Sequence, residues 1–362
     1  MTSKLRALPY VFFLLPFDLV IALCLSVSVP LCFRKRRITL TQRPDSSRTT
    51  IIIVNWDGKH LLADCLPAVI EAVRHDGRNH EILLVDNGST DGSVEFVRQN
   101  FSCVRVLALD RNYGFIGGND RGIAETRTDI VVLLNNDMIV DRAFLSPLLN
   151  GFSDTSVFAV TSQVFFADLD RRREETGKTR ARFENGFFYL WHDDIYPTDE
   201  AHETIPVFWA GGGSCAIDRK KYLAMGGFDS LYHPFYVEDT DLSYQAWKRG
   251  WKCLLAPASR VIHKHRSTSK AKFGQDFVEN TIRKNQYLFI WKNVTDIPMV
   301  VQHLVNLPRI HGRAMLRDTP AFEIRAFFRA FRQLPEALRK RFEHASHSLV
   351  SDREVLARSQ KS

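Results

Sequence analysis

The chain has 362 residues, of which 45% are hydrophobic and 25% charged, a balance typical of a folded globular protein. This composition excludes a collagen-like or disordered chain, and a multi-span transporter is excluded because only one apolar stretch approaches membrane length. The net charge of +8 is unevenly placed: residues 1–40 carry +5, residues 283–362 carry +8, and the segment between them carries −5. An acidic centre with basic ends argues against a nucleic-acid partner and favours an anionic membrane surface.

The N-terminus predicts membrane association. The almost wholly apolar run Tyr10–Phe33 is followed at once by the basic cluster Arg34–Arg37. As a helix this run would be about 36 Å long, enough for a bilayer core of about 30 Å, but a mid-bilayer residue such as Asp18 costs about 2.5–3.5 kcal/mol. A single span and a re-entrant helix therefore both remain open, with a helix buried in the protein core as a third alternative. In both membrane arrangements the basic cluster places the following residues on the cytoplasmic side of the inner (plasma) membrane.

Strand-like and helix-like runs alternate from residue 49 onwards. Short runs rich in Ile, Val and Leu are typical of buried parallel strands, and the stretches between them have helical periodicity. This alternation predicts a parallel sheet with helices on both faces, whose ligands bind beyond the carboxyl ends of the strands. The expected strands are 50–55, 81–86, 104–109 and 130–134, and the expected helices are 61–73, 93–100 and 117–125.

Polar residues gather where three of these strands end, at Asn55–Asp57, Asp86–Ser89 and Asn135–Asp137. A dinucleotide dehydrogenase is disfavoured because no GxGxxG motif follows the first strand, and a Walker lysine is missing as well. A bound nucleotide diphosphate would then need another counter-charge, and a divalent metal held by a carboxylate is the obvious one.

Seven short motifs in chain order resemble glycosyltransferase family 2, specifically its rhamnosyltransferase-like members, over about residues 49–270. The resemblance implies an α/β GT-A nucleotide-diphospho-sugar transferase fold, with a mostly parallel central sheet flanked by helices. It also implies an inverting transfer from a nucleotide-diphosphate sugar and a divalent metal, Mg²⁺ or Mn²⁺. We expect a membrane-associated helix with a basic flank in residues 1–40, the catalytic domain in 45–275 and a basic helical extension in 276–362. The motifs are Ile53–Trp56, Val85–Ser93, Asn112–Phe115, Leu133–Asp137, Gly226–Asp229, Glu238–Leu242 and Val261–His263.

The resemblance assigns roles to individual residues. It makes Asp239 the general base that takes the proton of the acceptor hydroxyl, with Glu238 beside it. It makes Asp137 and His263 the metal ligands, and Asn135 stands where the family pattern has the first Asp of Asp-x-Asp. The implied nucleotide-sugar contacts are Val54, Asn55, Asp86, Asn112, Gly117, Asn136 and Gly212.

Several of these assignments compete with a purely structural explanation. Asp86 precedes Asn-Gly, where an Asp also serves to form a turn. The Glu238-Asp239 pair begins a helical stretch, where carboxylates interact favourably with the helix macrodipole. A lone histidine such as His263 is more often structural than a ligand. The glycines of Trp209–Gly213 suit either a close approach to a ligand or a plain turn.

Two further regions are open to alternatives. The polar insert Asp168–Asp199 is too long for an idle loop, so we expect either an acceptor lid or a peripheral hairpin. Helices are expected at 283–291, 321–331 and 337–342. In the second of these, Arg and Phe alternate in a way that suits a helix at a membrane interface or one packed against the catalytic core.

These observations predict an inverting glycosyltransferase that moves one sugar from a nucleotide-diphosphate sugar, such as dTDP-rhamnose or a UDP-sugar, to a lipid-linked acceptor. The expected acceptor is a polyprenyl-diphosphate-linked glycan in O-antigen or surface-polysaccharide synthesis. A processive synthase is disfavoured because neither several spans nor a Gln-x-x-Arg-Trp motif is present. Two other classes compete. One is a non-catalytic membrane scaffold that retains the GT-A fold, favoured only by Asn135, and the other is a nucleotidyltransferase, whose glycine-rich basic phosphate loop is absent.

Overall fold

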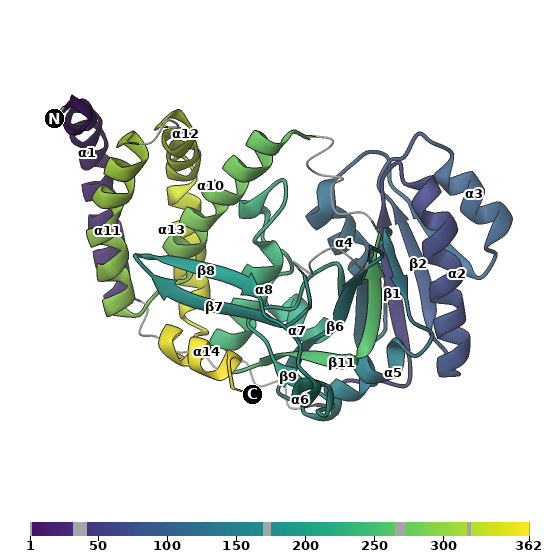
Figure 1. Cartoon of the computed structure of the whole chain (residues 1–362). Coiled ribbons are helices and arrows are strands. Elements are labelled where there is room, and N and C mark those ends of the chain that lie inside the picture. Colours follow the sequence, from purple (N-terminus) through teal and green to yellow (C-terminus); the bar gives the residue numbers. More distant parts are fainter. Residues whose placement is uncertain (1, 32–41, 169–174, 265–272, 317–319, 362) are drawn as a thin grey trace. The chain divides into compact units, whose positions relative to one another are not determined.

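The computed structural model describes residues 2–31, 42–168, 175–264, 273–316 and 320–361 (Figure 1). The chain forms two compact units. The sheet unit comprises residues 39–180, 191–266 and 357–362, and the helical unit comprises residues 1–38, 181–190 and 267–356.

The sheet unit is built around a nine-stranded sheet in the order β3-β2-β1-β4-β10-β6-β11-β5, with β9 paired to β11. The four strands expected from the sequence are present as β1 to β4, and they run parallel to one another. The strands are β1 (Thr49–Asn55), β2 (Glu81–Asp86), β3 (Val104–Ala108), β4 (Ile130–Asn135), β5 (Met138–Val140), β6 (Val157–Phe166), β9 (Ile205–Pro206), β10 (Ser214–Asp218) and β11 (Lys252–His263).

The sheet is mixed rather than mostly parallel, which corrects the expectation from the sequence. β10 runs antiparallel to β4 and β6, and both β5 and β9 run antiparallel to β11. For β5 the reason is visible at the end of β4, where only Asn136 and Asp137 separate the two strands in the chain. A parallel return needs a crossover of about a dozen residues or more, so a link this short forces the chain out of the parallel pattern.

Helices cover both faces of the parallel half, as expected. Alternate residues of β1 point to opposite faces. Ile51 and Ile53 pack into the core that includes Leu62 and Leu66 of α2, whereas Ile52 and Val54 lie against the glycines of α4 on the other face. The helices of this unit are α2 (Lys59–Asp76), α3 (Ser93–Asn100), α4 (Gly114–Ala124), α5 (Leu145–Asn150), α6 (Pro197–Glu200), α7 (Arg219–Ala224) and α8 (Glu238–Lys248).

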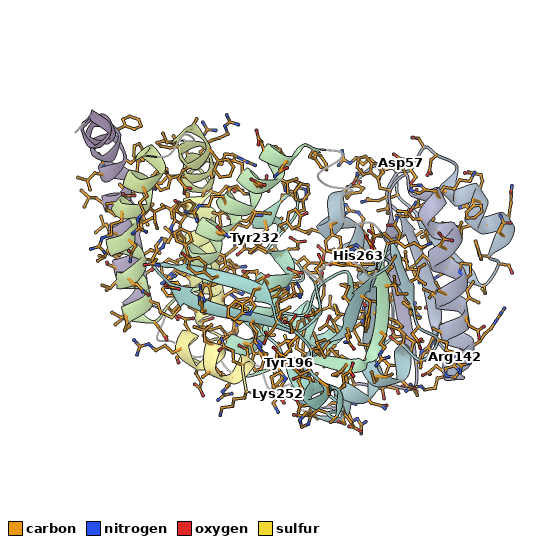
Figure 2. The ribbon with its side chains drawn as sticks, in the orientation of Figure 1. Asp57, Arg142, Tyr196, Tyr232, Lys252 and His263 are labelled. Carbon is orange, nitrogen blue, oxygen red and sulfur yellow. The ribbon has the colours of Figure 1, made fainter. Side chains whose placement is uncertain are left out.

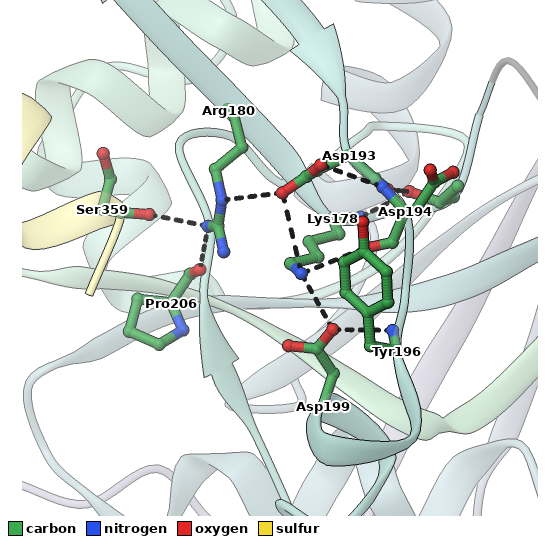
Figure 3. A network of polar contacts seen from close by, with 9 residues as sticks. Lys178, Arg180, Asp193, Asp194, Tyr196, Asp199, Pro206 and Ser359 are labelled. Carbon is green, nitrogen blue, oxygen red and sulfur yellow. Dashed lines mark hydrogen bonds and ion pairs between the residues drawn. The ribbon is translucent and has the colours of Figure 1, made fainter. Parts of the chain in front are cut away.

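Within the described part of the insert, strands β7 (Thr179–Glu184) and β8 (Phe187–His192) form a two-stranded hairpin. Buried charges hold its base within the sheet unit (Figure 3). Lys178 Nζ lies 2.8 Å from Asp199 Oδ2, and both side chains are buried. Arg180 donates to the carbonyl oxygens of Pro206 at 2.8 Å and Ser359 at 3.0 Å, which ties the end of the chain to the hairpin.

The helical unit contains α1 (Thr2–Leu31), α10 (Gln275–Asn293), α11 (Ile297–Leu316), α12 (Pro320–Phe331), α13 (Leu334–Ala345) and most of α14 (Asp352–Ser359). The predicted tail helices lie inside α10, α12 and α13. The aromatic side chains of α12 pack within this unit: Phe328 meets Phe17 of α1 edge-on, with 4.9 Å between the ring centroids. These rings thus pack on another helix of the same unit, which is neither of the two arrangements expected from the sequence.

The helix expected at the N-terminus is present as α1, but the membrane span is not supported. Among the described residues, no helix is both long enough and apolar enough to cross a bilayer. Asp18, which interrupts the apolar run, is buried, and its Oδ2 lies 3.3 Å from Nδ1 of the buried His311. The basic cluster that follows α1 in the sequence lies outside the described residues.

Candidate active site

The three polar clusters predicted at the strand ends meet at one edge of the sheet. Asn55 at the end of β1 donates from Nδ2 to Asp86 Oδ2 at the end of β2, at 3.2 Å. Asn136, just beyond β4, donates to Asn55 Oδ1 at 2.7 Å. Asn55 thus joins the ends of three parallel strands, where a sheet of this type binds its ligands.

Asp86 is held by the protein on both carboxylate oxygens. It is only 2% exposed, and besides Asn55 it accepts a hydrogen bond from the backbone N–H of Ser89 at 2.9 Å. The Asp86 side chain therefore stabilises the turn that follows β2. The buried Asn87 extends the same network by donating to Asn112 Oδ1 at 3.0 Å, which in turn accepts from the N–H of Gly114 at 2.7 Å. Asn112 is thereby fixed in the loop that leads into α4.

The glycines of α4 allow the helix to approach the sheet edge. A Cβ on Gly118 would lie 2.8 Å from Val54 Cγ1, and a Cβ on Gly117 would lie 2.8 Å from Tyr113 Cβ. Such distances are too short for a methyl group. Val54 and Gly117 therefore have a packing role at this edge in addition to the ligand contacts expected of them.

His263 lies between two carboxylates. As the last residue of β11 (Figure 2), it faces Met138 of β5 across an antiparallel ladder, which brings it beside Asp137. Its Nε2 is 3.1 Å from Asp137 Oδ2, and its Nδ1 is 3.1 Å from Glu175 Oε2. Burial lowers the pKa of His263, but the two carboxylates outweigh burial and raise it to about 10.

Asp137 and His263 fit a divalent metal as two of its ligands. Oδ1 of Asp137 is buried and has no hydrogen-bond partner among the described residues, so this carboxylate has an unused ligating atom. Carboxylate oxygen and imidazole both suit Mn²⁺, and Mg²⁺ is commonly held by one or two carboxylates plus substrate phosphates. No group of three or more His, Cys, Asp or Glu side chains within the described ranges could enclose a metal alone. Glu175 contacts the other ring nitrogen of His263, Nδ1, and so orients the imidazole ring.

The predicted catalytic pair begins α8. Val237, the residue before it, has a φ of 78°, which is rare for a β-branched residue and marks a strained backbone at the start of this helix. Glu238 is buried, and its Oε2 has no hydrogen-bond partner in the described part of the chain. Asp239 is half-buried and accepts from the N–H of Thr240 at 2.6 Å and of Gly212 at 3.3 Å.

Both carboxyl groups of the pair have raised pKa values. Burial raises the pKa of Glu238 to about 8, and the neighbouring Asp239 charge adds to the shift. Burial also raises the pKa of Asp239, while the N–H donors of Gly212 and Thr240 act in the opposite direction. Two adjacent carboxyl groups that resist ionisation together are a feature of sites that exchange protons.

The glycine segment Gly211–Gly213 joins this pair to the end of β4, which leads to Asp137. Gly213 accepts from the N–H of Asn135 at 2.8 Å, while Gly212 donates to Asp239. A Cβ on Gly213 would lie 2.8 Å from Asn135 Nδ2, so the side chain that replaces the expected first Asp packs directly on this glycine. Residues distant in sequence therefore form one continuous site within the sheet unit.

Part of the sheet unit matches a known family. Residues 50–223 match the family model described as Glycosyl transferase family 2. The resemblance to this family that the sequence motifs indicate is thus confirmed over that segment. Four of the seven motifs that suggested this family lie within the matched residues.

The names of the curated relatives of this chain describe transferases for different sugars. N-acetylgalactosaminyltransferase 6 of Drosophila melanogaster is 27% identical over 199 residues, which are 51% of this chain and 29% of that protein. N-acetylglucosaminyl-diphospho-decaprenol L-rhamnosyltransferase of Mycobacterium tuberculosis is 25% identical over 232 residues, which are 58% of this chain and 74% of that protein. The chain thus spans less than a third of the first relative and about three quarters of the second.

A solved structure confirms the GT-A fold of the chain. The crystal structure of GalNAc-T7 with UDP, GalNAc and Mn²⁺ superposes with a TM-score of 0.56 at 18% identity, covering 86% of this chain and 62% of that one.

Two site residues were missed in the sequence. Glu175 lies in the polar insert, far from any motif, and only the fold brings it to His263. Asn87 was quoted within a motif without a role, although its amide connects the β2 end to Asn112. Its position beside Asp86 was the available signal.

Proposed function

We propose that the protein is an inverting glycosyltransferase that moves one sugar from a nucleotide-diphosphate sugar to an acceptor hydroxyl. The observation that carries this proposal is Asp239, a half-buried carboxylate with a raised pKa, which is hydrogen-bonded through the glycine segment to the edge that bears Asp137. In the proposed reaction Asp239 accepts the proton of the acceptor hydroxyl as its oxygen attacks the anomeric carbon. The bond from that carbon to the diphosphate breaks, and the nucleoside diphosphate leaves with inversion.

The surrounding residues hold the reactants. Asn55 and Asn136 present amide groups, and Asp86 a carboxylate, at the strand ends where the nucleotide would bind. Asp137 and His263 would hold Mg²⁺ or Mn²⁺, and Glu175 fixes the orientation of the His263 ring. When bound, such a metal neutralises the charge of the diphosphate.

For the substrates, we propose dTDP-rhamnose or a UDP-sugar as the donor and a polyprenyl-diphosphate-linked glycan as the acceptor, in surface-polysaccharide or O-antigen synthesis. The support is the mycobacterial relative, whose name describes an L-rhamnosyltransferase acting on a lipid-linked diphosphate. We also propose that the enzyme works at the cytoplasmic side of the inner (plasma) membrane. The basic ends of the chain and the apolar N-terminal run support this location.

The test is release of nucleoside diphosphate from a panel of uridine, thymidine and guanosine diphosphate sugars, with Mg²⁺ or Mn²⁺ and a lipid-linked acceptor. Asp239→Asn is assayed in parallel. We expect one donor to be used, with metal dependence and loss of turnover in the variant. Nucleotide binding without turnover for every donor would favour the non-catalytic scaffold, whose one supporting feature is Asn135 at the first position of the metal motif.

A further inference from the structure

The two faces of α1 differ in character. The buried residues recur at intervals of three and four, as one side of a helix requires. They are Leu14, Asp18, Ile21, Leu25 and Ser28. The opposite side is apolar and open to solvent, and it carries no charged residue between positions 13 and 28. Its large side chains, between 44% and 66% exposed, are Phe13, Leu19, Val20, Leu23 and Val27.

The neighbouring helix α11 carries a matching stripe. α1 and α11 lie side by side and run in opposite directions (Figure 1). On α11 every fourth residue is exposed, and the first three of these are apolar while the last two are basic. They are Ile297, Val301, Val305, Arg309 and Arg313. We call the exposed stripes of the two helices together the α1–α11 face.

The contact between Asp18 and His311 fixes the rotation of α1. Both side chains are buried between the helices, with 3.3 Å between Oδ2 and Nδ1. Rotating α1 to expose Asp18 would break this pair and bury the apolar stripe instead. Asp18, the acidic residue that makes α1 unsuitable as a membrane span, is therefore turned away from the exposed side of α1, and the exposed residues between positions 13 and 28 carry no charge.

We infer that the α1–α11 face docks onto the surface of an anionic phospholipid bilayer, with both helices lying in the plane of one leaflet. Apolar side chains of the face would enter the boundary between headgroups and acyl chains, and Arg309 and Arg313 would meet lipid phosphates. This inference deepens the proposed membrane location by naming the surface and the lipid, and it does not depend on the transfer chemistry.

The charges around the face favour a bilayer over a second copy of the chain. The apolar stripe of α11 ends in two arginines, and in the sequence Lys4 and Arg6 precede the stripe of α1 while Arg34–Arg37 follow it. Two copies joined through this face would bring like charges together at its margins, whereas an anionic lipid surface complements them. In-plane helices with an apolar side and a basic margin are typical of proteins that bind one leaflet.

The test is flotation of the full-length protein with vesicles of phosphatidylglycerol and phosphatidylethanolamine, and with vesicles of phosphatidylcholine alone. We expect binding to the anionic vesicles, weakened at least about tenfold by the double variant Leu23→Glu/Val305→Glu. Leu223→Glu, at a leucine of α7 in the sheet unit that is 50% exposed, is the matched control and should bind as the unchanged protein does. Arg309→Gln/Arg313→Gln leaves the apolar stripe intact and should reduce only the preference for anionic lipid.

Several results would overturn the inference. They are no vesicle binding by the unchanged protein, equal flotation of Leu23→Glu/Val305→Glu, or resistance of the bound protein to alkaline carbonate, which would indicate a span. A shift from dimer to monomer in the double variant without any vesicle binding would assign the face to a second copy. Donor turnover with a soluble acceptor is measured without vesicles in the same variants. Absence of turnover in the unchanged protein, together with intact flotation, would count against the proposed function alone.

Discussion

The backbone N–H of Gly212 donates to Asp239 Oδ2 at 3.3 Å. The next residue, Gly213, accepts from the N–H of Asn135 at the end of β4. Two adjacent glycines thus set the position of the proposed base relative to the strand end that leads to Asp137. Neither contact is accessible to local sequence patterns, because α8, the glycine segment and β4 are far apart in the chain.

Asp239→Asn should lower kcat by at least about a hundredfold, because general-base catalysis contributes about that much and an amide cannot accept the proton. The donor KM should change little, since the variant keeps the size of the side chain. Steady-state release of nucleoside diphosphate gives both constants, and binding of the nucleoside diphosphate by calorimetry shows that the site is still formed. An unchanged kcat would assign the base to another residue.

Gly213→Ala should lower kcat by about tenfold or more, because small displacements in an active site are costly. The added methyl group would lie 2.8 Å from Asn135 Nδ2 and would push the glycine segment away from β4. Gly211→Ala is a matched control two residues away, where nothing lies within 4 Å of the new Cβ. Equal activity of the two variants would contradict the positioning role of this contact.

Glu175→Gln should weaken the apparent affinity for Mn²⁺ by about 10- to 100-fold, the usual effect of losing a carboxylate that orients a ligating histidine. Turnover should recover when the metal is saturating, because Glu175 contacts His263 and not the reactants. A titration of activity against Mn²⁺ concentration separates the two effects. If the metal dependence of the variant matches that of the unchanged enzyme, the role assigned to Glu175 is wrong.

The raised pKa of Glu238 makes stability depend on pH. Its value moves from the ordinary 4.5 to about 8 on folding. Between these pH values the folded chain holds a proton that the unfolded chain releases, so the free energy of unfolding falls as pH rises. The free energy of unfolding is measured by urea unfolding at about pH 5 and about pH 8. In Glu238→Gln the difference between these two values should be smaller than in the unchanged protein by at least about 1 kcal/mol. Glu184→Gln, at a side chain that is 52% exposed, is the control and should leave the pH dependence of the free energy of unfolding unchanged. If Glu238→Gln also has the pH dependence of the unchanged protein, the raised pKa assigned to Glu238 is wrong.

The parts of the fold that could be predicted are those with local signals. β1, β2 and β4 are buried apolar runs followed by polar clusters, so both the strands and their convergence could be inferred from the pattern. The antiparallel half could not, because β5 and β9 are only three and two residues long and have no periodicity of their own. Asp18 could be recognised as incompatible with a span, but its partner His311 lies 293 residues away. Only tertiary packing brings the two together.

Lys178→Met should destabilise the protein by about 3–5 kcal/mol, because it leaves Asp199 buried without its cation. The two side chains are 6% and 8% exposed, so water cannot replace the lost partner. Lys252→Met is the matched control: it breaks a pair with Asp154 at 2.7 Å whose side chains are 47% and 46% exposed. An exposed pair of this kind contributes about 0–1 kcal/mol. Urea unfolding of both variants at one pH makes the comparison, and similar losses in the two would mean that burial at the hairpin base has little effect on this ion pair.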